Sequence, residues 1–395
     1  PDALTWLAGA DPADTRPLPP FSDLAVEFLA ALSQALRAAP GARALPDVQT
    51  FAFWCRRANL DRLREIQDRR QLRLGRGLLF HVAPANVPVN FAFSFAFGLL
   101  AGNANVVRVP SRPSATVDAI CAAMGALLAE PRFRDLAASQ GIVRFAADSG
   151  WSEAFSARSD GRLIWGGDAT VAALRTMPTK PRCVDVAFAD RTSLCVMGAA
   201  AVAAVDADGL ERLAADFYND TYLMDQNACS SPHLVLWLGT PEQAAAAAGR
   251  FWPALAQVVA QRYALAPVQA VDKYADLLDA ILDGEAIAGV SRFGGGLTVA
   301  DLSTLPPDLE QRRGRFGLFR QMAADSLSPL AGVLSGRFQT MTYFGADAAQ
   351  LGRFVTDHRL AGIDRIVPVG RALDMDLVWD GFDLIGQLSR IIDLR

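Results

Sequence analysis

Short apolar runs alternate with longer amphipathic segments along most of the chain. The first 75 residues are predicted to be helical, because apolar residues recur there at intervals of three and four. Beyond them, four apolar runs have the length and the polar or glycine borders of buried strands: GLLFHV (77–82), NANVVRV (103–109), GIVRFA (141–146) and GRLIWG (161–166). Together with a helical segment at 113–130, they predict a mostly parallel sheet with helices on both faces. Such sheets bind nucleotides at the carboxyl ends of their strands.

One apolar segment fits two structures. Phe91, Phe93, Phe95 and Phe97 alternate as residues of a strand do, yet residues four apart also share one face of a helix. The pattern therefore leaves this segment open between a strand and a helix.

The pattern restarts near residue 195. A short apolar run leads into an amphipathic helix that has Asp206 or Asp208 as its N-cap and ends near Met224, and residues 233–238 (HLVLWL) are predicted to form the next strand. The GGG triplet at 294–296 follows no strand that leads into a helix, so we expect a hairpin turn there. We predict an α/β protein with three parts: a helical start and nucleotide-binding domain (1–195), a second α/β domain (196–370) and a C-terminal segment (371–395).

Composition narrows the function classes. Hydrophobic residues make up 51% of the chain and charged residues 20%, which is enough to bury a large core. The formal net charge of -4 provides no basic stripe for a phosphate backbone, so no nucleic-acid partner is expected. The longest apolar run, 89–102, is too short to span a membrane and contains Asn90 and Ser94. Small molecules remain as the expected ligands.

The five cysteines are scattered and lack the CxxC spacing of a zinc site or redox pair, so we expect reduced thiols, a cytoplasmic location and no metal. Cys229 stands apart, because the sequence MDQNACSSPH surrounds it with polar residues. It is either an inert core thiol, the common fate of a free cysteine, or a nucleophile on an exposed connection. His233 begins an apolar strand and is not expected to be its base.

Several short motifs, in order, carry a resemblance to a known family. PANVP (84–88), LLAGN (99–103) and DQNAC (225–229) resemble the aldehyde dehydrogenase superfamily. More narrowly, DQNACSSP, FQTMTYF (338–344), GIDRIVPVG (362–370) and WDG (379–381) resemble the LuxC-like acyl-CoA reductases, the reductase component of the bacterial luminescence fatty-acid reductase. The resemblance runs from about residue 77 to the end and implies a Rossmann-type nucleotide-binding domain beside a catalytic α/β domain.

The resemblance also implies a covalent mechanism. Cys229 is expected to be the nucleophile that forms an acyl-enzyme as coenzyme A leaves, and hydride from a nicotinamide then releases the aldehyde. Asn86 is implied as the oxyanion donor, together with the backbone N–H of Cys229. The other interpretation of Asn86 is a turn residue held between Pro84 and Pro88.

The cofactor expected from the resemblance is NADPH. In the superfamily, a basic residue five positions after the asparagine of the GN pair contacts the adenosine ribose. Counted from Asn103, this position is Arg108. Three positions further, where many NAD-dependent members carry a glutamate, this chain has Ser111. A guanidinium suits the 2′-phosphate, and a serine removes the repelling carboxylate. Arg108 as the solvated end of a strand is the alternative, and the role of Arg112 stays open.

Three further positions are implied as cofactor contacts. Gly166 and Gly167 stand where relatives turn from a strand into a helix near the pyrophosphate, although Asp168 could serve only as an N-cap there. Thr340, with Gln339, is implied on the nicotinamide side, and a core strand position explains Thr340 equally well.

The leading hypothesis is NADPH-dependent reduction of an acyl thioester, with a fatty acyl-CoA as the expected substrate. One alternative is an aldehyde dehydrogenase that runs oxidatively, for which relatives carry a glutamate base in an ELGGK-like segment. The comparable segment here, DVAFADRTS (185–193), has only Asp185 and Asp190 as acids. The other alternative is a non-redox acyl-transfer protein that uses the same cysteine. The acyl carrier, a homo-oligomer and a complex with an acyl-supplying enzyme stay open.

Overall fold

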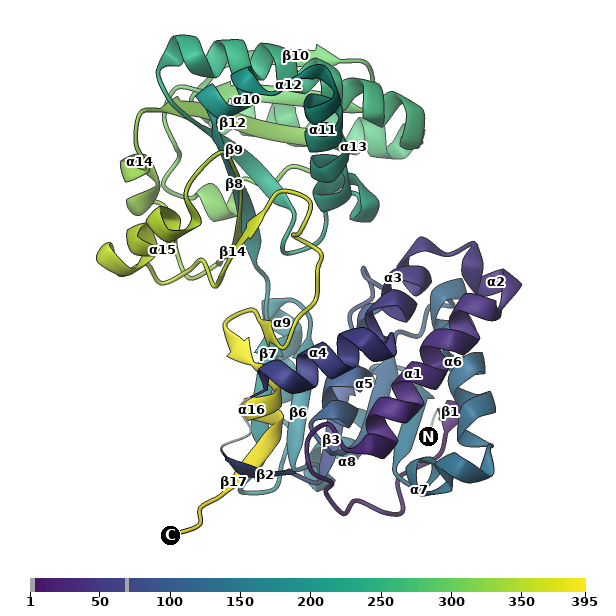
Figure 1. Cartoon of the computed structure of the whole chain (residues 1–395). Helices are drawn as coiled ribbons and strands as arrows, with labels where there is room; N and C mark the ends of the chain where they lie inside the picture. Colours follow the sequence, from purple (N-terminus) through teal and green to yellow (C-terminus); the bar gives the residue numbers. More distant parts are fainter. Residues whose placement is uncertain (1–3, 68–70) are drawn as a thin grey trace. The chain divides into compact units, whose positions relative to one another are not determined.

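The structure is a computed structural model of the chain and describes residues 4–67 and 71–395 (Figure 1). Two compact units divide it: unit 1 comprises the chain up to Ala189 together with Met375–Arg395, and unit 2 comprises Asp190–Asp374. The observed borders differ from those expected at 195 and 370. A border at 195 would cut through one strand of unit 2, Thr192–Gly198, and the C-terminal segment belongs to unit 1.

Unit 1 is built on a six-stranded sheet in the order β1-β5-β4-β3-β6-β7. The strands from β3 onward are parallel, and β1 pairs antiparallel with β5 at one edge. The chain runs outward from β3 through β4 to β5 and then returns to place β6 on the other side of β3. The connections therefore change direction between β3 and β6, which is where such sheets bind ligands. The strands are β1 (Thr5–Gly9), β3 (Leu78–Val82), β4 (Ala104–Val109), β5 (Gln140–Arg144), β6 (Gly161–Trp165) and β7 (Val184–Phe188).

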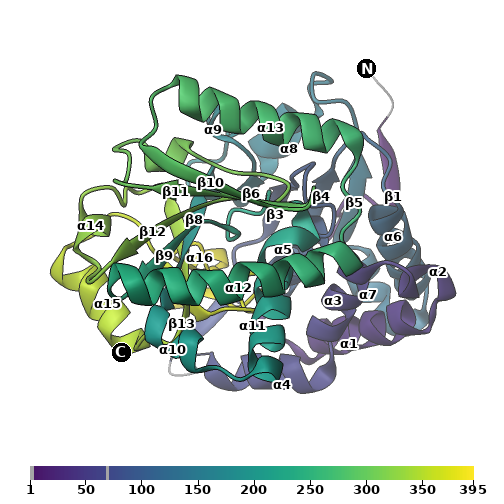
Figure 2. The ribbon, with the colours of Figure 1, turned by 90° about the horizontal axis from the view of Figure 1, so that it is seen from above.

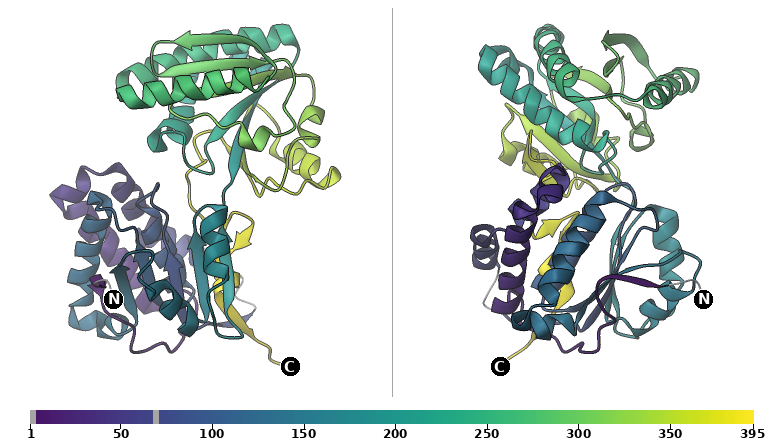
Figure 3. Two further views of the ribbon diagram at one scale, coloured as in Figure 1. Left: turned by 180° about the vertical axis from the view of Figure 1, so that it is seen from behind. Right: turned by 90° about the vertical axis from the view of Figure 1, so that its right-hand side faces the viewer.

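Helices cover both faces of this sheet, as expected from the alternating pattern (Figure 3, right). One hydrophobic cluster joins α1, α3, α4, α5 and α6 to one face, and another joins α8 and α9 to the opposite face. The helices are α1 (Asp23–Ala38), α2 (Pro40–Arg43), α3 (Pro46–Trp54), α4 (Arg57–Ile66), α5 (Asn90–Leu100), α6 (Ala115–Leu128), α7 (Arg134–Ala137), α8 (Trp151–Arg158) and α9 (Asp168–Arg175), with the 3₁₀ turn η1 (Pro131–Phe133).

The segment that fitted two structures is the helix α5. Every residue from Phe91 to Leu100 is buried, so no polar face marks the helical period. Its one polar interior residue, Ser94, completes a buried network: its hydroxyl lies 2.8 Å from His81 Nδ1 and accepts a hydrogen bond from Trp165 Nε1. Burial lowers the pKa of His81 to about 4, so this imidazole is neutral and structural.

The expectation of a helical first segment is correct for α1 to α4 and wrong at both of its ends. Thr5–Gly9 forms β1, and Leu72–Gly75 forms β2, which pairs with β17 (Ser389–Ile392) near the C-terminus. Both strands exist because of partners more than a hundred residues away, which local periodicity does not reveal. Residues 68–70, within the segment expected to be helical, lie outside the described residues.

Unit 2 is built on a seven-stranded sheet in the order β10-β11-β12-β9-β8-β13-β14, parallel except for the hairpin of β10 and β11. The triplet at 294–296 forms the turn of that hairpin, as expected. The strands are β8 (Thr192–Gly198), β9 (Pro232–Leu238), β10 (Ile287–Phe293), β11 (Leu297–Leu302), β12 (Leu318–Ala324), β13 (Phe338–Phe344) and β14 (Arg365–Pro368).

Two hydrophobic clusters again lie on the two faces of the sheet in unit 2. One is packed by α10, α11 and α12, and the other by α14 and α15. Figure 2 shows α12 and α13 on opposite sides of β10 to β12. The elements are α10 (Ala199–Ala204), α11 (Ala207–Thr221), α12 (Pro241–Arg262), α13 (Pro267–Leu282), α14 (Ser328–Ala331) and α15 (Ala348–Asp357), with η2 (Tyr222–Met224) and η3 (Leu309–Gln311). Asp206 caps α11, as one of the two alternatives predicted.

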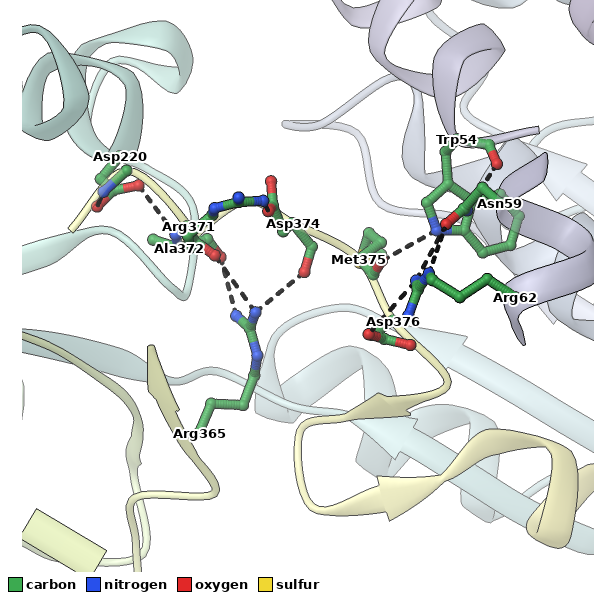
Figure 4. Close-up of polar contacts among 11 residues, drawn as sticks. Trp54, Asn59, Arg62, Asp220, Arg365, Arg371, Ala372, Asp374, Met375 and Asp376 are labelled. Carbon is green, nitrogen blue, oxygen red and sulfur yellow. Dashed lines mark hydrogen bonds and ion pairs between the residues drawn. The ribbon is translucent and has the colours of Figure 1, made fainter. Parts of the chain in front are cut away.

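After β14 the chain leaves unit 2 at Asp374. Buried and charged side chains of unit 2 hold the residues just before this point (Figure 4). The carboxylate of Asp220, on α11, accepts hydrogen bonds from the N–H groups of Gly370 (2.7 Å) and Ala372 (2.9 Å). Arg365 donates to the carbonyls of Ala372 (2.9 Å) and Asp374 (3.0 Å). The backbone polar groups of this irregular segment are therefore satisfied without a strand.

The chain then becomes part of unit 1. Within that unit Trp54 Nε1 donates to the carbonyl of Met375 at 2.9 Å (Figure 4). The pairs β15 (Val378–Trp379) with β16 (Phe382–Asp383) and β17 with β2 follow, and α16 (Leu384–Leu388) packs against α5. The C-terminal residues thereby complete the core of the first unit. In the described part of the chain, no helix combines the length and the apolar character that a membrane crossing needs.

Candidate active site

Cys229 lies in the connection between η2 and β9, as the sequence predicted. Its side chain is half-buried. Burial raises the pKa of the Cys121 and Cys195 thiols to about 12, raises that of Cys55 well above its usual value, and also raises that of Cys183. Burial thus keeps these four thiols in the protonated, unreactive form. The candidate nucleophile is set apart from them by its place in a polar connection.

A tight backbone turn precedes the nucleophile. Asp225 and Gln226 have φ values of 52° and 63°, in the left-handed region that side chains other than glycine seldom adopt. Tyr263 donates its hydroxyl to Asp225 Oδ1 at 2.6 Å. Two successive left-handed residues reverse the chain between η2 and Cys229, and such strained positions often occur at functional sites.

The side chain of Gln226 holds this turn in place. Its Oε1 accepts from the N–H of Gly317 (3.1 Å), and its Nε2 donates to the carbonyls of Pro232 (3.2 Å) and Leu318 (3.1 Å). The residue is only 1% exposed, so each bond satisfies a group that water does not reach. One amide therefore joins the start of the Cys229 connection to its end and to β12.

Ser193 anchors the peptide of the nucleophile itself. Its hydroxyl donates to the carbonyl of Cys229 at 2.7 Å and accepts from the N–H of Thr340 at 3.0 Å, and the side chain is 1% exposed. Both neighbouring ladders shift register at this place: β13 against β8 between Phe338 and Met341, and β9 against β8 beside Ser193. Bulges of this kind free backbone groups from the ladder and often occur next to active sites.

Neither Ser193 nor Gln226 was predicted as a site residue. Gln226 could have been suspected, because a polar residue beside the candidate nucleophile was visible in DQNAC. Ser193 offered no signal, since its role depends on the register of three strands.

Thr340, which was predicted, lies in β13 with no exposed surface, and its hydroxyl donates to Gln339 Oε1 at 3.3 Å. Its described contacts fit the alternative of a core strand position.

His233 lies in β9 and is buried. Burial, followed by the positive charges of Arg313 and Arg320, lowers its pKa to about 3. A base with so low a pKa holds too little affinity for a proton to activate a thiol. The structure thus agrees with the expectation that His233 is not the base of Cys229.

The predicted oxyanion donor and the predicted cofactor residues of unit 1 lie at one edge of its sheet. Asn86 is exposed in the connection after β3, Ser111 is exposed just after β4, and Gly166 and Gly167 follow β6. Because β3, β4 and β6 are parallel, their carboxyl ends meet at the same edge. The residues after β3 and β6 flank the point where the connections change direction, the preferred ligand position in such sheets.

Arg108 occupies the end of β4 with its guanidinium over the ring of Phe145, 5.2 Å from the ring centroid. Burial lowers its pKa, and in the described part of the chain its Nε has no hydrogen-bond partner. The Nε atom itself is buried, but the residue is only half-buried, so an anionic ligand at the edge would meet the rest of the guanidinium.

The other cofactor candidates are partly engaged with the protein. Ser111 donates its hydroxyl to the carbonyl of Phe145 at 3.2 Å, so it would have to rotate before it could donate to a ligand. The N–H of Gly166 donates to the carbonyl of Phe188 at 3.2 Å. Gly167 is exposed as the N-cap residue of α9, with no atom within 4 Å of the place where a Cβ would stand. The open space beside Gly167 lets a ligand approach this helix start.

The two acids of the DVAFADRTS segment are both ion-paired. Asp185 accepts two bonds of 2.7 Å each from the buried guanidinium of Arg162, within unit 1. Asp190 accepts from Arg313 Nη1 at 2.7 Å, within unit 2. Each of these carboxylates is thus engaged by a guanidinium of its own unit.

Comparisons with known proteins agree with this picture. The family model described as acyl-CoA reductase (LuxC) matches residues 25–299. A mutant 1-pyrroline-5-carboxylate dehydrogenase from Thermus thermophilus is 10% identical with a TM-score of 0.62, over 93% of this chain and 80% of that chain. A NAD-dependent benzaldehyde dehydrogenase from Corynebacterium glutamicum is 15% identical with a TM-score of 0.58, over 93% and 84%. An indole-3-acetaldehyde dehydrogenase solved with NAD⁺ is 11% identical with a TM-score of 0.60, over 94% and 81%.

None of the curated proteins compared with the chain matches it. The fold is that of the aldehyde dehydrogenases, and the protein is an oxidoreductase that acts on acyl or aldehyde substrates. The chain belongs to the LuxC acyl-CoA reductase family. The resemblance inferred from the short motifs and the predicted fold class are both confirmed.

Proposed function

We propose that this protein reduces an acyl thioester, a fatty acyl-CoA, to the aldehyde with NADPH through an acyl group carried on Cys229. The observation that carries the proposal is the position and the fixed surroundings of the Cys229 thiol. It is half-buried in a connection fixed by Gln226 and Ser193, in a chain of the LuxC family. Preorganised surroundings of this kind suit a nucleophile that must meet a carbonyl in one orientation.

The proposed reaction proceeds in two steps. The thiolate of Cys229 attacks the carbonyl carbon, the new C–S bond forms, the bond to coenzyme A breaks, and CoA leaves as a thiolate that takes a proton from solvent. NADPH, when bound, supplies the hydride that reduces the acyl carbon. The C–S bond to Cys229 then breaks, which releases the aldehyde and restores the thiolate. Asn86 and the backbone N–H of Cys229 are the proposed donors to the oxyanion in both steps.

The preference for NADPH is supported by the charges at the carboxyl edge of unit 1. Arg108 is half-buried at the end of β4, its Nε has no partner in the described chain, and position 111 is a serine. A guanidinium pairs well with a phosphate, and no carboxylate at position 111 repels one. We propose Gly166 and Gly167 for the pyrophosphate and Thr340 for the nicotinamide side, as the resemblance implies.

Reduction is favoured over hydrolysis by the lack of a base. The segment in which oxidising relatives carry a glutamate contains only Asp185 and Asp190, which are held by Arg162 and Arg313. With no glutamate in this segment to activate water, the acyl-enzyme is expected to persist for minutes without NADPH. Rapid release of free fatty acid that disappears on changing either aspartate would favour the hydrolytic alternative.

The decisive experiment is intact-protein mass spectrometry after mixing with acyl-CoAs of graded chain length, followed by NADPH. We expect a mass increase of one acyl group, which NADPH removes with formation of aldehyde. Cys229→Ala should abolish loading, while the matched variant Cys183→Ala, at the other half-buried thiol, should load normally. Acylation of the Cys229→Ala protein would overturn the proposal. Loading without NADPH oxidation would favour the non-redox alternative.

A further inference from the structure

A pocket of about 260 Å³ lies within unit 2 beside the Cys229 connection. Asn227 and Ala228, the two residues before the nucleophile, form part of its wall. Three arginines, Arg191, Arg313 and Arg315, form another part. The pocket is therefore polar and close in the chain to the proposed point of reaction. A hydrocarbon chain placed in it would desolvate three guanidinium groups, so this is not where an acyl tail is expected.

Guanidinium groups outnumber carboxylates among the side chains that face this pocket. Asp276 is the one carboxylate that lines it, against three guanidinium groups. Each guanidinium is nevertheless paired with a carboxylate: Arg315 with Asp276, Arg313 with Asp190 at 2.7 Å, and Arg191 with Asp364 at 2.5 Å. What the wall offers to an anion is therefore N–H donors that remain after these ion pairs.

The arginines differ in what they have left to donate. Arg315 is committed to Asp276 through Nε (2.7 Å) and Nη2 (3.0 Å). Arg313 donates Nη1 to Asp190 at 2.7 Å and Nε to the carbonyl of Glu310 at 3.4 Å. In the described part of the chain its Nη2 makes no hydrogen bond. A guanidinium has five N–H groups, so Arg313 can bind an anion while it keeps its ion pair.

His233 lines the same pocket but offers no further donor to a ligand. It is 6% exposed, and its Nδ1 is a buried atom with no hydrogen-bond partner among the described residues. Burial and the charges of Arg313 and Arg320 lower its pKa, and a backbone hydrogen bond with Gly314 opposes them. The donors that Arg313 keeps are therefore the groups that the pocket offers to an anion.

We propose that the pocket is a phosphate subsite that holds a phosphate group of a reactant while the reacting end of that molecule is at Cys229. The inference rests on the proposed function and adds a binding site to it. The phosphates of NADPH are already proposed to bind Arg108, Ser111, Gly166 and Gly167 in unit 1. The phosphates of the coenzyme A thioester remain, and they present the chemistry that Arg313 recognises.

The test compares two arginines that share one carboxylate. Arg313 and Arg337 both pair with Asp190, at 2.7 Å and 3.9 Å, but only Arg313 lines the pocket. Arg313→Gln and Arg337→Gln are prepared in a Cys229→Ala background, so that binding is measured without acylation. Dissociation constants are measured for dodecanoyl-CoA, for dodecanoyl-pantetheine, which has no phosphate, and for NADPH.

We expect Arg313→Gln to weaken dodecanoyl-CoA by about tenfold to a hundredfold, the effect of one charge-assisted hydrogen bond. Binding of the pantetheine thioester and of NADPH should not change. Arg337→Gln should bind all three ligands normally, and Arg313→Lys should recover part of the loss. Inorganic phosphate should compete with dodecanoyl-CoA in the parent and not in Arg313→Gln.

Three outcomes would overturn the subsite: equal weakening by the two glutamine variants, a weakening of NADPH or of the pantetheine thioester at least equal to that of dodecanoyl-CoA, or no change in any dissociation constant. Because these are binding measurements, they remain informative if Cys229 proves not to be acylated. In that case the proposed reaction fails while the subsite stands. If instead the enzyme loads normally and the dissociation constants do not change, the reaction stands and the subsite fails.

Discussion

The candidate site residues of unit 1 are mostly exposed, whereas the residues that hold Cys229 in unit 2 are buried and hydrogen-bonded within the protein. At the carboxyl edge of unit 1, Asn86, Ser111 and Gly167 are exposed on connections between strands and helices. Around Cys229 in unit 2, Gln226 and Ser193 are almost fully buried, and their side chains make three and two hydrogen bonds, respectively. Exposed groups can be completed by a ligand, whereas buried polar groups must be completed by the protein. Substitutions in unit 1 should therefore affect binding or rate alone, and those around Cys229 should affect stability as well.

The largest effect is expected at Asn86. Asn86→Ala should lower the rate of acylation by about a hundredfold to a thousandfold, since it removes a donor to the developing oxyanion. The melting temperature and the NADPH dissociation constant should not change, because the side chain is exposed. Stopped-flow acylation and thermal unfolding measure the two quantities. A change confined to KM would contradict the oxyanion role, because the donor should matter most in the transition state.

Substitution of Ser193 should lower both the stability of the protein and the rate of acylation. Ser193→Ala leaves the carbonyl of Cys229 and the N–H of Thr340 without their buried partner, which should cost about 1–3 kcal/mol in unfolding free energy. Acylation should slow by about tenfold or more, because the peptide of the nucleophile is no longer fixed. Ser193 acts through Cys229, so kcat should fall while KM for NADPH stays unchanged.

The matched control for Ser193 is Ser231→Ala. Ser231 is also buried in the Cys229 connection, but its hydroxyl donates to the carbonyl of Asp220 at 2.7 Å and makes no described hydrogen bond with Cys229. It should lose similar stability and much less acylation rate. If both serine variants lost rate in proportion to stability, Ser193 would have only a structural role.

Ser111 tests the charge at the edge of unit 1. Ser111→Glu should weaken NADPH by about tenfold or more and leave NADH nearly unaffected, because a carboxylate repels the 2′-phosphate. Ser111→Ala removes the hydrogen bond to Phe145 without adding charge and should change cofactor preference little. Steady-state kinetics with both cofactors measures the preference. Equal efficiency with NADH in the parent enzyme would refute the assignment.

The smallest effect is a pH dependence at Asp220. Burial, opposed by the N–H groups of Gly370 and Ala372, raises its pKa to about 7 from a usual value of 3.8. A raised pKa means that the folded state binds the proton more tightly, so this contribution to stability is full below about pH 4 and is lost as the pH rises through 7. Asp220→Asn cannot titrate. We expect the melting temperature of the parent, relative to that of Asp220→Asn, to fall by a few degrees between pH 5 and pH 8. A constant difference across that range would show that the carboxyl is already ionised at pH 5.

Much of the site in unit 1 could be predicted because it follows from local features. GLLFHV and GRLIWG have the pattern of buried parallel strands, and side chains just after such strands meet at one edge. The prediction that the first segment is entirely helical was wrong at its ends, because β1 and β2 depend on partner strands far along the chain. The apolar run of α5 stayed ambiguous because burial on all sides removes the polar face by which a helix is recognised.

The sequence alone determined the strand and helix pattern of an α/β fold and singled out Cys229, since apolar periodicity and a thiol among polar residues are properties of neighbours in the chain. Only the tertiary structure decided that Ser193 and Gln226 hold that thiol's connection and that Arg313 and His233 share a pocket wall. These contacts depend on the register of β8 with β9 and β13 and on how connecting loops pack. A shift of one residue changes which side chains face each other, and the free energy that fixes the register comes from the whole core.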